Sequence, residues 1–189
     1  AGSTRPTRVR TAIRISARAA LMSSASDLMK RLFWLMITAL TVVIDQLTKL
    51  LAVKFLKPVD TVPLIEGVLH LTYLENRGAA FGMLKDHRWV FMVTSTVAVI
   101  AVLAFMMAGY KKYYNPLLFT GLSFIAGGGI GNMIDRVANG FVVDFIDFRL
   151  INFAIFNGAD SFVCVGAGLV VIYVIISDVK ARKAGKTAE

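Results

Sequence analysis

The sequence predicts an all-α membrane protein with four transmembrane helices, and three observations support this prediction. Hydrophobic residues make up 57% of the 189 residues and charged residues only 17%, which is more apolar than a soluble core of this size requires. Four apolar segments are each close to the ~20 residues that span a bilayer. Basic residues flank alternate connections between these segments, which places both termini in the cytoplasm.

The predicted helices cover, approximately, residues 32–51, 89–109, 117–136 and 159–177. The short basic connection 110–116 belongs in the cytoplasm, whereas the longer connections 52–88 and 137–158 belong outside. Residues 29–189 are therefore expected to form one four-helix domain. Residues 1–28 are rich in Arg, Ser and Ala, and we expect a disordered extension or an expression remnant there, with an organelle transit peptide as the alternative.

The two outer connections differ in pattern. In the first, the segments 61–65 and 68–76, rich in β-branched and aromatic residues, flank Glu66-Gly67, which predicts a small extracytoplasmic β-hairpin. The second, residues 138–157, mixes five phenylalanines with two aspartates and an arginine. That composition is typical of a segment in the membrane interface, so we expect it to form a loop over the outer ends of the helices.

Three aspartates are expected at similar depth. At 1.5 Å per residue, Asp135 lies about 27 Å beyond the start of the third helix. Asp160 lies about 27 Å from the far end of the fourth helix, and Asp45 about 21 Å beyond Arg31. All three approach the outer boundary of a ~30 Å hydrocarbon core, so they occupy one layer.

Neighbouring charges distinguish these acids. Asp45 is followed at i+4 by Lys49, a pairing that satisfies both charges within one helix, so we interpret Asp45 as structural. Asp135 precedes Arg136, but adjacent residues diverge by about 100° on a helix, so the arginine need not neutralise it. Asp160 has no basic residue nearby in the sequence.

Two unneutralised acids in one layer favour aspartic peptidase chemistry. They can share one proton, because two like charges at close range in a low dielectric do not both ionise. One carboxyl group then activates water, and the other donates a proton to the scissile amide. Taken singly, however, an aspartate at a helix end is more simply explained as a solvated or capping residue.

Each acid has an asparagine three residues earlier. Asn132 shares a helix face with Asp135, where its amide can hold the acid or bind a substrate backbone. Asn157 has an equivalent role or caps the fourth helix, and both alternatives remain open. Gly127 and Gly131 form a G-x-x-x-G motif, which indicates close approach of another helix or of a bound peptide.

Composition also limits the classes of ligand. The formal charge of +9 comes mainly from residues that precede or flank the apolar segments, so nucleic-acid binding is disfavoured. The single cysteine, Cys164, excludes an intrachain disulfide and a cysteine-based metal site. It lies within an apolar run and is expected to be inert.

Five segments together resemble, in order and spacing, the lipoprotein signal peptidase family, signal peptidase II. They are VIDQLTK (43–49), NRGAAFG (76–82), GGGIGNMIDR (127–136), VVDFIDF (142–148) and FNGAD (156–160). The sequence departs from the family in its Arg-rich residues 1–28 and in Gly158, where a larger apolar residue is usual.

The resemblance implies a bacterial inner-membrane aspartic endopeptidase, with its site on the outer side and no metal or organic cofactor. Its substrates would be prolipoproteins, cut on the amino side of a diacylglyceryl-modified cysteine, and globomycin would inhibit it. The implied catalytic pair is Asp135 and Asp160. The implied substrate-positioning and supporting residues are Asn132, Arg136, Asn157, Ala159, Asn76, Gly78, Asp45 and Lys49.

Two other function classes also use intramembrane acids or close helix packing. A small transporter or proton pathway would place carboxylates at several depths, whereas these cluster in one outer layer. A non-catalytic assembly partner would use the glycine face and leave both aspartates dispensable.

Overall fold

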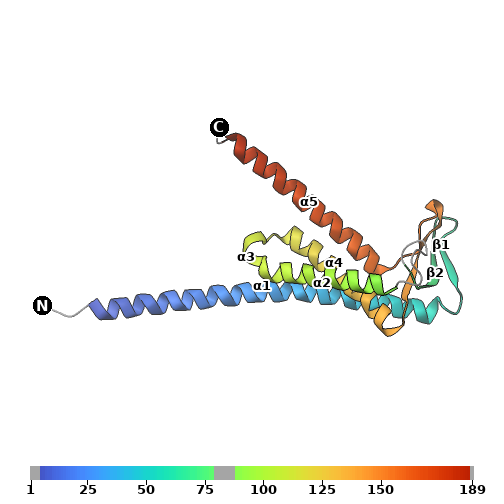
Figure 1. The fold of residues 1–189 in the computed structure, drawn as a ribbon, viewed down its shortest axis with the longest axis horizontal. Helices are drawn as coiled ribbons and strands as arrows, with labels where there is room; N and C mark the ends of the chain where they lie inside the picture. The colour runs from blue at the N-terminus through green and yellow to red at the C-terminus, as the bar shows by residue number, and fades with distance from the viewer. Residues whose placement is uncertain (1–4, 79–87, 188–189) are drawn as a thin grey trace.

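The computed structural model describes residues 5–78 and 88–187, and the chain is mostly helical (Figure 1). The helices are α1 (Arg5–Phe55), α2 (Arg88–Ala108), α3 (Tyr110–Tyr113), α4 (Pro116–Ala138) and α5 (Gly158–Thr187), with a 3-10 turn at Arg149–Ile151. Within the described residues, three helices are long and apolar enough to cross a membrane: Leu21–Phe55, Pro116–Ala138 and Gly158–Gly185. The apolar part of α2, Met92–Ala108, is shorter.

The first helix is longer than expected. It begins at Arg5, so residues 5–28, for which we expected a disordered extension or an expression remnant, are helical. The reason lies in the local composition, because residues 7–28 contain neither glycine nor proline and are rich in alanine and arginine, which favour helices. Pro6 lies at the helix start, where a missing N–H costs nothing.

Helix α4 is the centre of the helical part and contacts α1, α2 and α5. Glycines permit this close packing: a Cβ added at Gly127 would lie 2.6 Å from the Cβ of Thr41 on α1. Likewise, a Cβ at Gly121 would lie 2.7 Å from the carbonyl oxygen of Gly166 on α5. The glycine motif therefore does serve close helix approach, as one of its two interpretations predicted.

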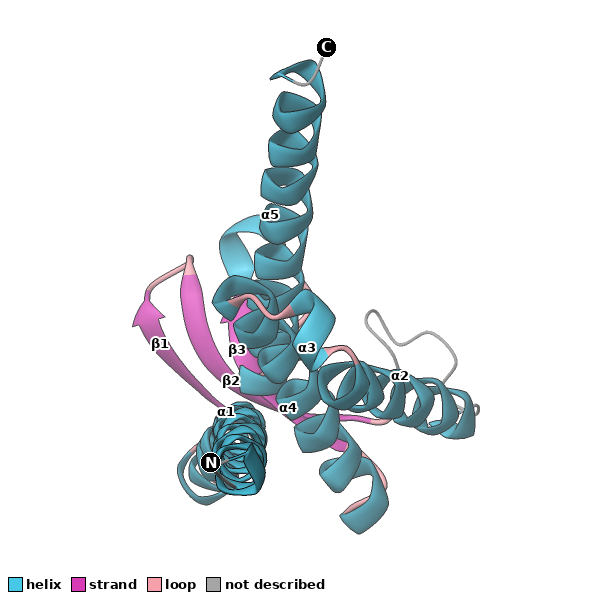
Figure 2. Cartoon of the chain, turned by 90° about the vertical axis from the view of Figure 1, so that its left-hand side faces the viewer, coloured by secondary structure: helices cyan, strands magenta, loops and turns pink. Residues whose placement is uncertain are grey.

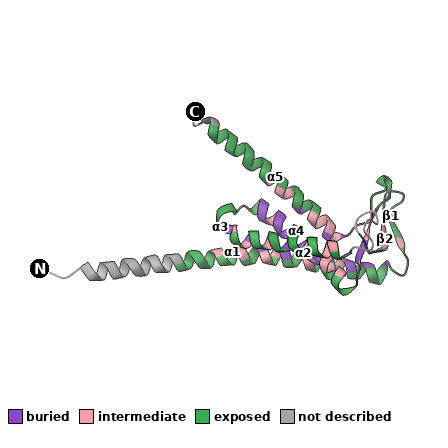
Figure 3. Ribbon diagram, viewed as in Figure 1, coloured by how far each residue is buried: buried purple, intermediate pink, exposed green. Residues whose placement is uncertain are grey.

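Helix α5 packs against α4 over its first half, as at Gly166 beside Gly121, and its C-terminal part extends away from the other helices (Figures 1 and 2). Most of its length is exposed (Figure 3), and the exposed side chains include Val171, Val174 and Ile175. An apolar helix surface of this extent fits a lipid environment.

The predicted hairpin is confirmed, and it belongs to a three-stranded antiparallel sheet of order β1-β2-β3. Strand β1 is Thr61–Ile65 and β2 is Leu69–Asn76, with Gly67 in the turn at φ 70°. The third strand, β3 (Val142–Phe148), corrects the expectation of an irregular interfacial loop. It was missed because VVDFIDF lacks the strict alternation that identifies a half-buried strand.

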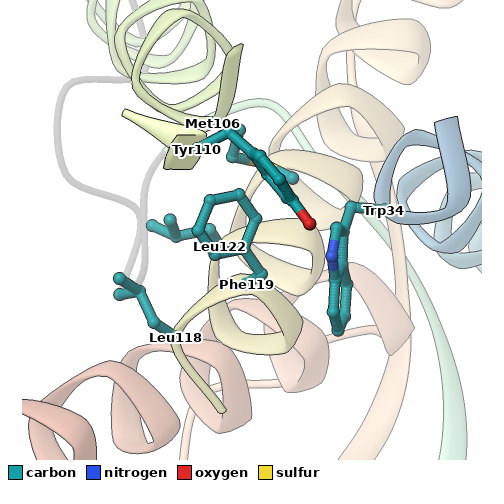
Figure 4. Close-up of a cluster of buried hydrophobic side chains, with 6 residues drawn as sticks. All are labelled: Trp34, Met106, Tyr110, Leu118, Phe119 and Leu122. Carbon is teal, nitrogen blue, oxygen red and sulfur yellow. The ribbon is translucent and has the colours of Figure 1, made fainter. Parts of the chain in front are cut away.

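The register of β2 against β3 matters for the site. Asn76 pairs with Val142 and Glu75 with Val143, so the end of β2 lies beside the connection between α4 and β3. The sheet therefore covers the ends of α4 and α5 at one end of the molecule (Figure 1). At the opposite end, a hydrophobic cluster packs between the helices. It contains Trp34, Met106, Tyr110, Leu118, Phe119 and Leu122 (Figure 4).

Candidate active site

A cavity of about 400 Å³ lies where α4, α5 and the sheet meet. Its polar lining includes Asn76, Asn132, Arg136, Asp144 and Asp160. The apolar residues 153–156 belong to the same lining. A cavity of this size, mostly apolar with a few convergent polar groups, is the usual form of a substrate site.

Asp160 is fixed at the start of α5 by a reciprocal cap. Its backbone N–H donates to Oδ1 of Asn157 at 3.0 Å, and the N–H of Asn157 donates to Oδ2 of Asp160 at 3.2 Å. This is the capping-box arrangement, so the interpretation of Asn157 as an N-cap is confirmed. Nδ2 of Asn132 donates to Oδ1 of Asp160 at 2.8 Å, which holds the carboxylate from α4.

Asp144 is the acid that accompanies Asp160 on the cavity wall. It lies on β3, is 2% exposed, and accepts hydrogen bonds from Nδ2 of Asn76 at 2.8 Å and Nδ2 of Asn157 at 2.6 Å. Burial raises the pKa of Asp144 to about 6, the nearby charge of Asp160 adds to the rise, and the two amide donors oppose it.

Two asparagine side chains link the two acids. Nδ2 of Asn157 donates both to Asp144 and, at 3.0 Å, to Oδ1 of Asn132. Asn132 in turn donates to Asp160. Within residues 5–78 and 88–187, neither Asp144 nor Asp160 forms an ion pair. Amide N–H groups therefore donate to both carboxylates, and no ion pair among the described residues neutralises either one. Both conditions favour a shared proton.

Asp135 has a different environment from the one predicted. Nζ of Lys49 lies 3.1 Å from its Oδ2, so the prediction that Asp135 lacks a neutralising partner is wrong. The lysine belongs to α1, so the residues near Asp135 in the sequence could not indicate this pair. Asp135 is 3% exposed and is not part of the cavity lining; instead, its Oδ2 accepts the N–H of Val143 at 3.0 Å. Asp135 thus fastens β3 to the end of α4.

The predicted pair of Asp45 and Lys49 is confirmed at 2.9 Å, but it is part of a larger network. Nζ of Lys49 also donates to Oδ1 of Asn132 at 2.8 Å. Asp45 accepts the backbone N–H of Ala159 at 2.8 Å, which ties α1 to the first turn of α5. Asp45 and Lys49 are not among the residues that line the cavity, but they hold Asn132 and the first turn of α5 in place.

The other predicted residues lie at the cavity. Gly78 donates its N–H to Oδ1 of Asn76 at 3.0 Å, and both residues line the cavity. Arg136 lines it as well, and its guanidinium donates to the carbonyl oxygen of Asn132 at 3.3 Å. The rest of the NRGAAFG segment, residues 79–82, lies outside the described residues. The structure therefore brings all ten predicted residues to one region.

Asp144 is the residue that the sequence interpretation missed as a site residue. The predicted acids lie at helix ends, whereas Asp144 lies in β3, a strand that the sequence pattern does not identify. The available signal was an aspartate inside the apolar run Val-Val-Asp-Phe, because a buried acid needs an explanation. Among the described residues, no cluster of His, Cys, Asp or Glu has the composition to hold a metal ion.

Comparisons with known proteins agree with the fold and the motifs. The family model for signal peptidase (SPase) II matches residues 37–176. The lipoprotein signal peptidase of Brevibacillus brevis is 41% identical over 151 residues, which cover 80% of this chain and 100% of the relative. That of Caldanaerobacter subterraneus is 50% identical over 133 residues, covering 70% of this chain and 89% of the relative.

A solved structure described as a bacterial membrane enzyme has the same fold. It superposes with a TM-score of 0.70 at 32% sequence identity, over 77% of this chain and 89% of the other. A second structure of the same description gives a TM-score of 0.67 at 33% identity. Given the matching motifs, fold and relatives, this chain belongs to the signal peptidase II family.

Proposed function

We propose that this chain is an aspartic endopeptidase that removes signal peptides from bacterial prolipoproteins within the membrane. The cut falls on the amino side of the diacylglyceryl-modified cysteine. One observation carries the proposal: Asp144 and Asp160 line the same cavity, are linked through asparagine amides, and form no ion pair among the described residues.

The surroundings of the two acids favour different roles. Asp160 lies in the first turn of α5, where the helix dipole stabilises a negative charge, and it accepts a backbone N–H and an amide N–H. Asp160 therefore acts as the ionised general base. The pKa of Asp144 is raised to about 6, so this carboxyl group keeps its proton below that pH and acts as the general acid.

The reaction then follows from these roles. Asp160 removes a proton from a water molecule, whose oxygen attacks the scissile carbonyl carbon, while Asp144 donates its proton to the carbonyl oxygen. The tetrahedral intermediate collapses when the proton held by Asp160 passes to the amide nitrogen and the C–N bond breaks. The carbonyl re-forms as its proton returns to Asp144, which restores the starting protonation states.

The contacts of Asp135 support a different role from the one that the resemblance implies. The family resemblance placed the catalytic pair on Asp135 and Asp160, but Asp135 is ion-paired with Lys49 and is absent from the cavity lining. We assign it a supporting role, in which it positions β3 and so Asp144. Asn76, Gly78 and Arg136 line the cavity and are placed to hold the substrate backbone.

The proposed arrangement in the membrane has four spans and both termini in the cytoplasm of a bacterial inner membrane. Helix α2 would be the fourth span, since it packs beside α4 and is apolar over Met92–Ala108. The cavity then lies at the outer boundary, where a signal helix arriving through the bilayer presents its lipidated cysteine. Globomycin-type cyclic peptides would occupy the same cavity.

Cleavage of a lipidated precursor tests the proposal. The purified chain is incubated with a diacylglyceryl-modified prolipoprotein and, as the matched control, with the unmodified precursor, and the products are identified by mass spectrometry. The expected result is a mature product that begins at the modified cysteine, obtained from the lipidated precursor alone. Equal cutting of both precursors, or of neither, would contradict the proposal.

A further inference from the structure

A second polar cavity, of about 230 Å³, lies at the other end of the helices from the carboxylate pair. It forms where α1 passes the α3 connection, far from the sheet (Figure 1). Its lining consists of Ser24, Asp27, Leu28, Arg31 and Lys111. The α1 residues are spaced i, i+3, i+4 and i+7, so they share one helix face.

This cavity contains both signs of charge. Nζ of Lys111 lies 3.6 Å from Oδ2 of Asp27, a long ion pair in which the lysine side chain is 73% exposed and the aspartate 25%. The guanidinium of Arg31 lies over the ring of Tyr110 at 5.4 Å. Nε of Arg31 is buried and has no hydrogen-bond partner among the described residues. Two cations and one anion thus line the cavity, and the Nε–H of Arg31 is available to a ligand.

The level of this cavity in the membrane follows from its neighbours. Arg31 lies 18 residues before Lys49, or about 27 Å along α1, which is close to the ~30 Å thickness of a hydrocarbon core. Trp34, Tyr110 and Tyr114 surround this end, as aromatic residues do at the bilayer boundary. The hydroxyl of Tyr110 lies beside the Trp34 indole (Figure 4). The cavity is therefore at the depth of lipid headgroups.

We propose that this cavity binds the headgroup of an aminophospholipid, with phosphatidylethanolamine as the matching chemistry. Arg31 and Lys111 bind the phosphate, and Asp27 accepts hydrogen bonds from the primary ammonium. An anionic headgroup without an amine would leave Asp27 without an ammonium partner, and the carboxylate would repel its phosphate. A choline headgroup has no N–H to donate, so it would lose the hydrogen bonds to Asp27. The lysines at this end indicate the cytoplasmic leaflet.

Native mass spectrometry of the full purified chain tests this proposal. The protein is equilibrated in detergent with equal amounts of phosphatidylethanolamine, phosphatidylglycerol and phosphatidylcholine, and retained lipid is measured. Asp27→Asn removes the acceptor for the ammonium, and Lys111→Gln removes a phosphate contact. Lys112→Gln is the matched control, since it removes one exposed charge that does not line the cavity. Thermal unfolding of each variant without added lipid shows that it is folded.

The expected result is preferential retention of phosphatidylethanolamine by the parent chain and by Lys112→Gln. Asp27→Asn should retain about fivefold less phosphatidylethanolamine while its retention of phosphatidylglycerol does not fall. Lys111→Gln should lower retention of both. Equal retention of the three lipids, or an unchanged preference in Asp27→Asn, would overturn the proposal. So would displacement of the lipid by an equal concentration of soluble phosphoethanolamine, because the ligand would then be a free metabolite.

Discussion

Replacing Lys49 with methionine removes a cation that pairs with two buried carboxylates. Nζ of Lys49 lies 2.9 Å from Asp45 and 3.1 Å from Asp135, and the three side chains are at most 4% exposed. Methionine preserves much of the volume, so the variant tests the charge rather than the packing. It leaves two carboxylates without their cation in a site that water does not reach.

The expected cost follows from the burial. Removing one partner of a buried ion pair destabilises a protein by about 3–5 kcal/mol. For a chain of this size each kcal/mol lowers Tm by about 2–4 °C, so Lys49→Met should lower Tm by about 6–20 °C. The measurement is thermal unfolding of the purified protein in detergent, followed by circular dichroism.

Two further variants make this prediction specific. Lys57→Met breaks an exposed pair with Glu75, in which the lysine side chain is 53% exposed, and should leave Tm almost unchanged. Adding Asp45→Asn to Lys49→Met removes one of the unpaired charges and should recover part of the lost Tm. If Lys49→Met melted at the same temperature as Lys57→Met, the buried network would not support the fold as argued.

Three other predictions concern the site and its packing. The raised pKa of Asp144, about 6, means that this group loses its proton as the pH rises through that value. Above pH 6, kcat/KM for a lipidated precursor should therefore fall by about tenfold per pH unit, and a flat profile from pH 5 to 8 would contradict the assigned role. Asn76→Ala removes the amide that donates to Asp144, so kcat/KM should fall by about 10- to 100-fold without a matching loss of Tm. If the variant had the kcat/KM of the parent protein, this hydrogen bond would have no part in catalysis. Gly131→Ala places a methyl group against the carboxylate of Asp45 and should destabilise the chain by about 1–3 kcal/mol, whereas Gly168→Ala meets open space; equal unfolding curves for the two would refute the close approach.

Local apolar patterns predicted where α1, α2, α4 and α5 lie, although α1 begins earlier and α5 ends later than expected. The apolar run 117–136 was predicted as a helix, and α4 spans Pro116–Ala138, with the side chain of Asn115 accepting the N–H of Leu117 at 2.9 Å. The hairpin was also predictable, because Glu66-Gly67 separates two runs of strand-forming residues and Gly67 adopts the positive φ that such a turn requires. These features depend on residues that are close in the sequence.

The parts that failed depend on contacts between distant segments. Strand β3 exists because it pairs with β2 and is covered by the helix ends, and neither contact leaves an alternating pattern in its own residues. Lys49 neutralises Asp135 across 86 positions of sequence, so charge spacing along one helix could not reveal the pair. Both errors affected the same conclusion, since they made Asp135 look free and left Asp144 out of the site.

The assignment of Asp144 and Asp160 as the catalytic pair is tested most directly by three matched variants. The initial rate of cleavage of a diacylglyceryl-modified precursor is measured for Asp144→Asn, Asp160→Asn and Asp135→Asn at equal amounts of folded protein. We predict that Asp144→Asn and Asp160→Asn each lower the rate by about 10²–10⁴-fold, whereas Asp135→Asn retains readily measurable cleavage. Parent-rate cleavage by Asp144→Asn, or its loss in a folded Asp135→Asn protein while Asp144→Asn stays active, would contradict the account.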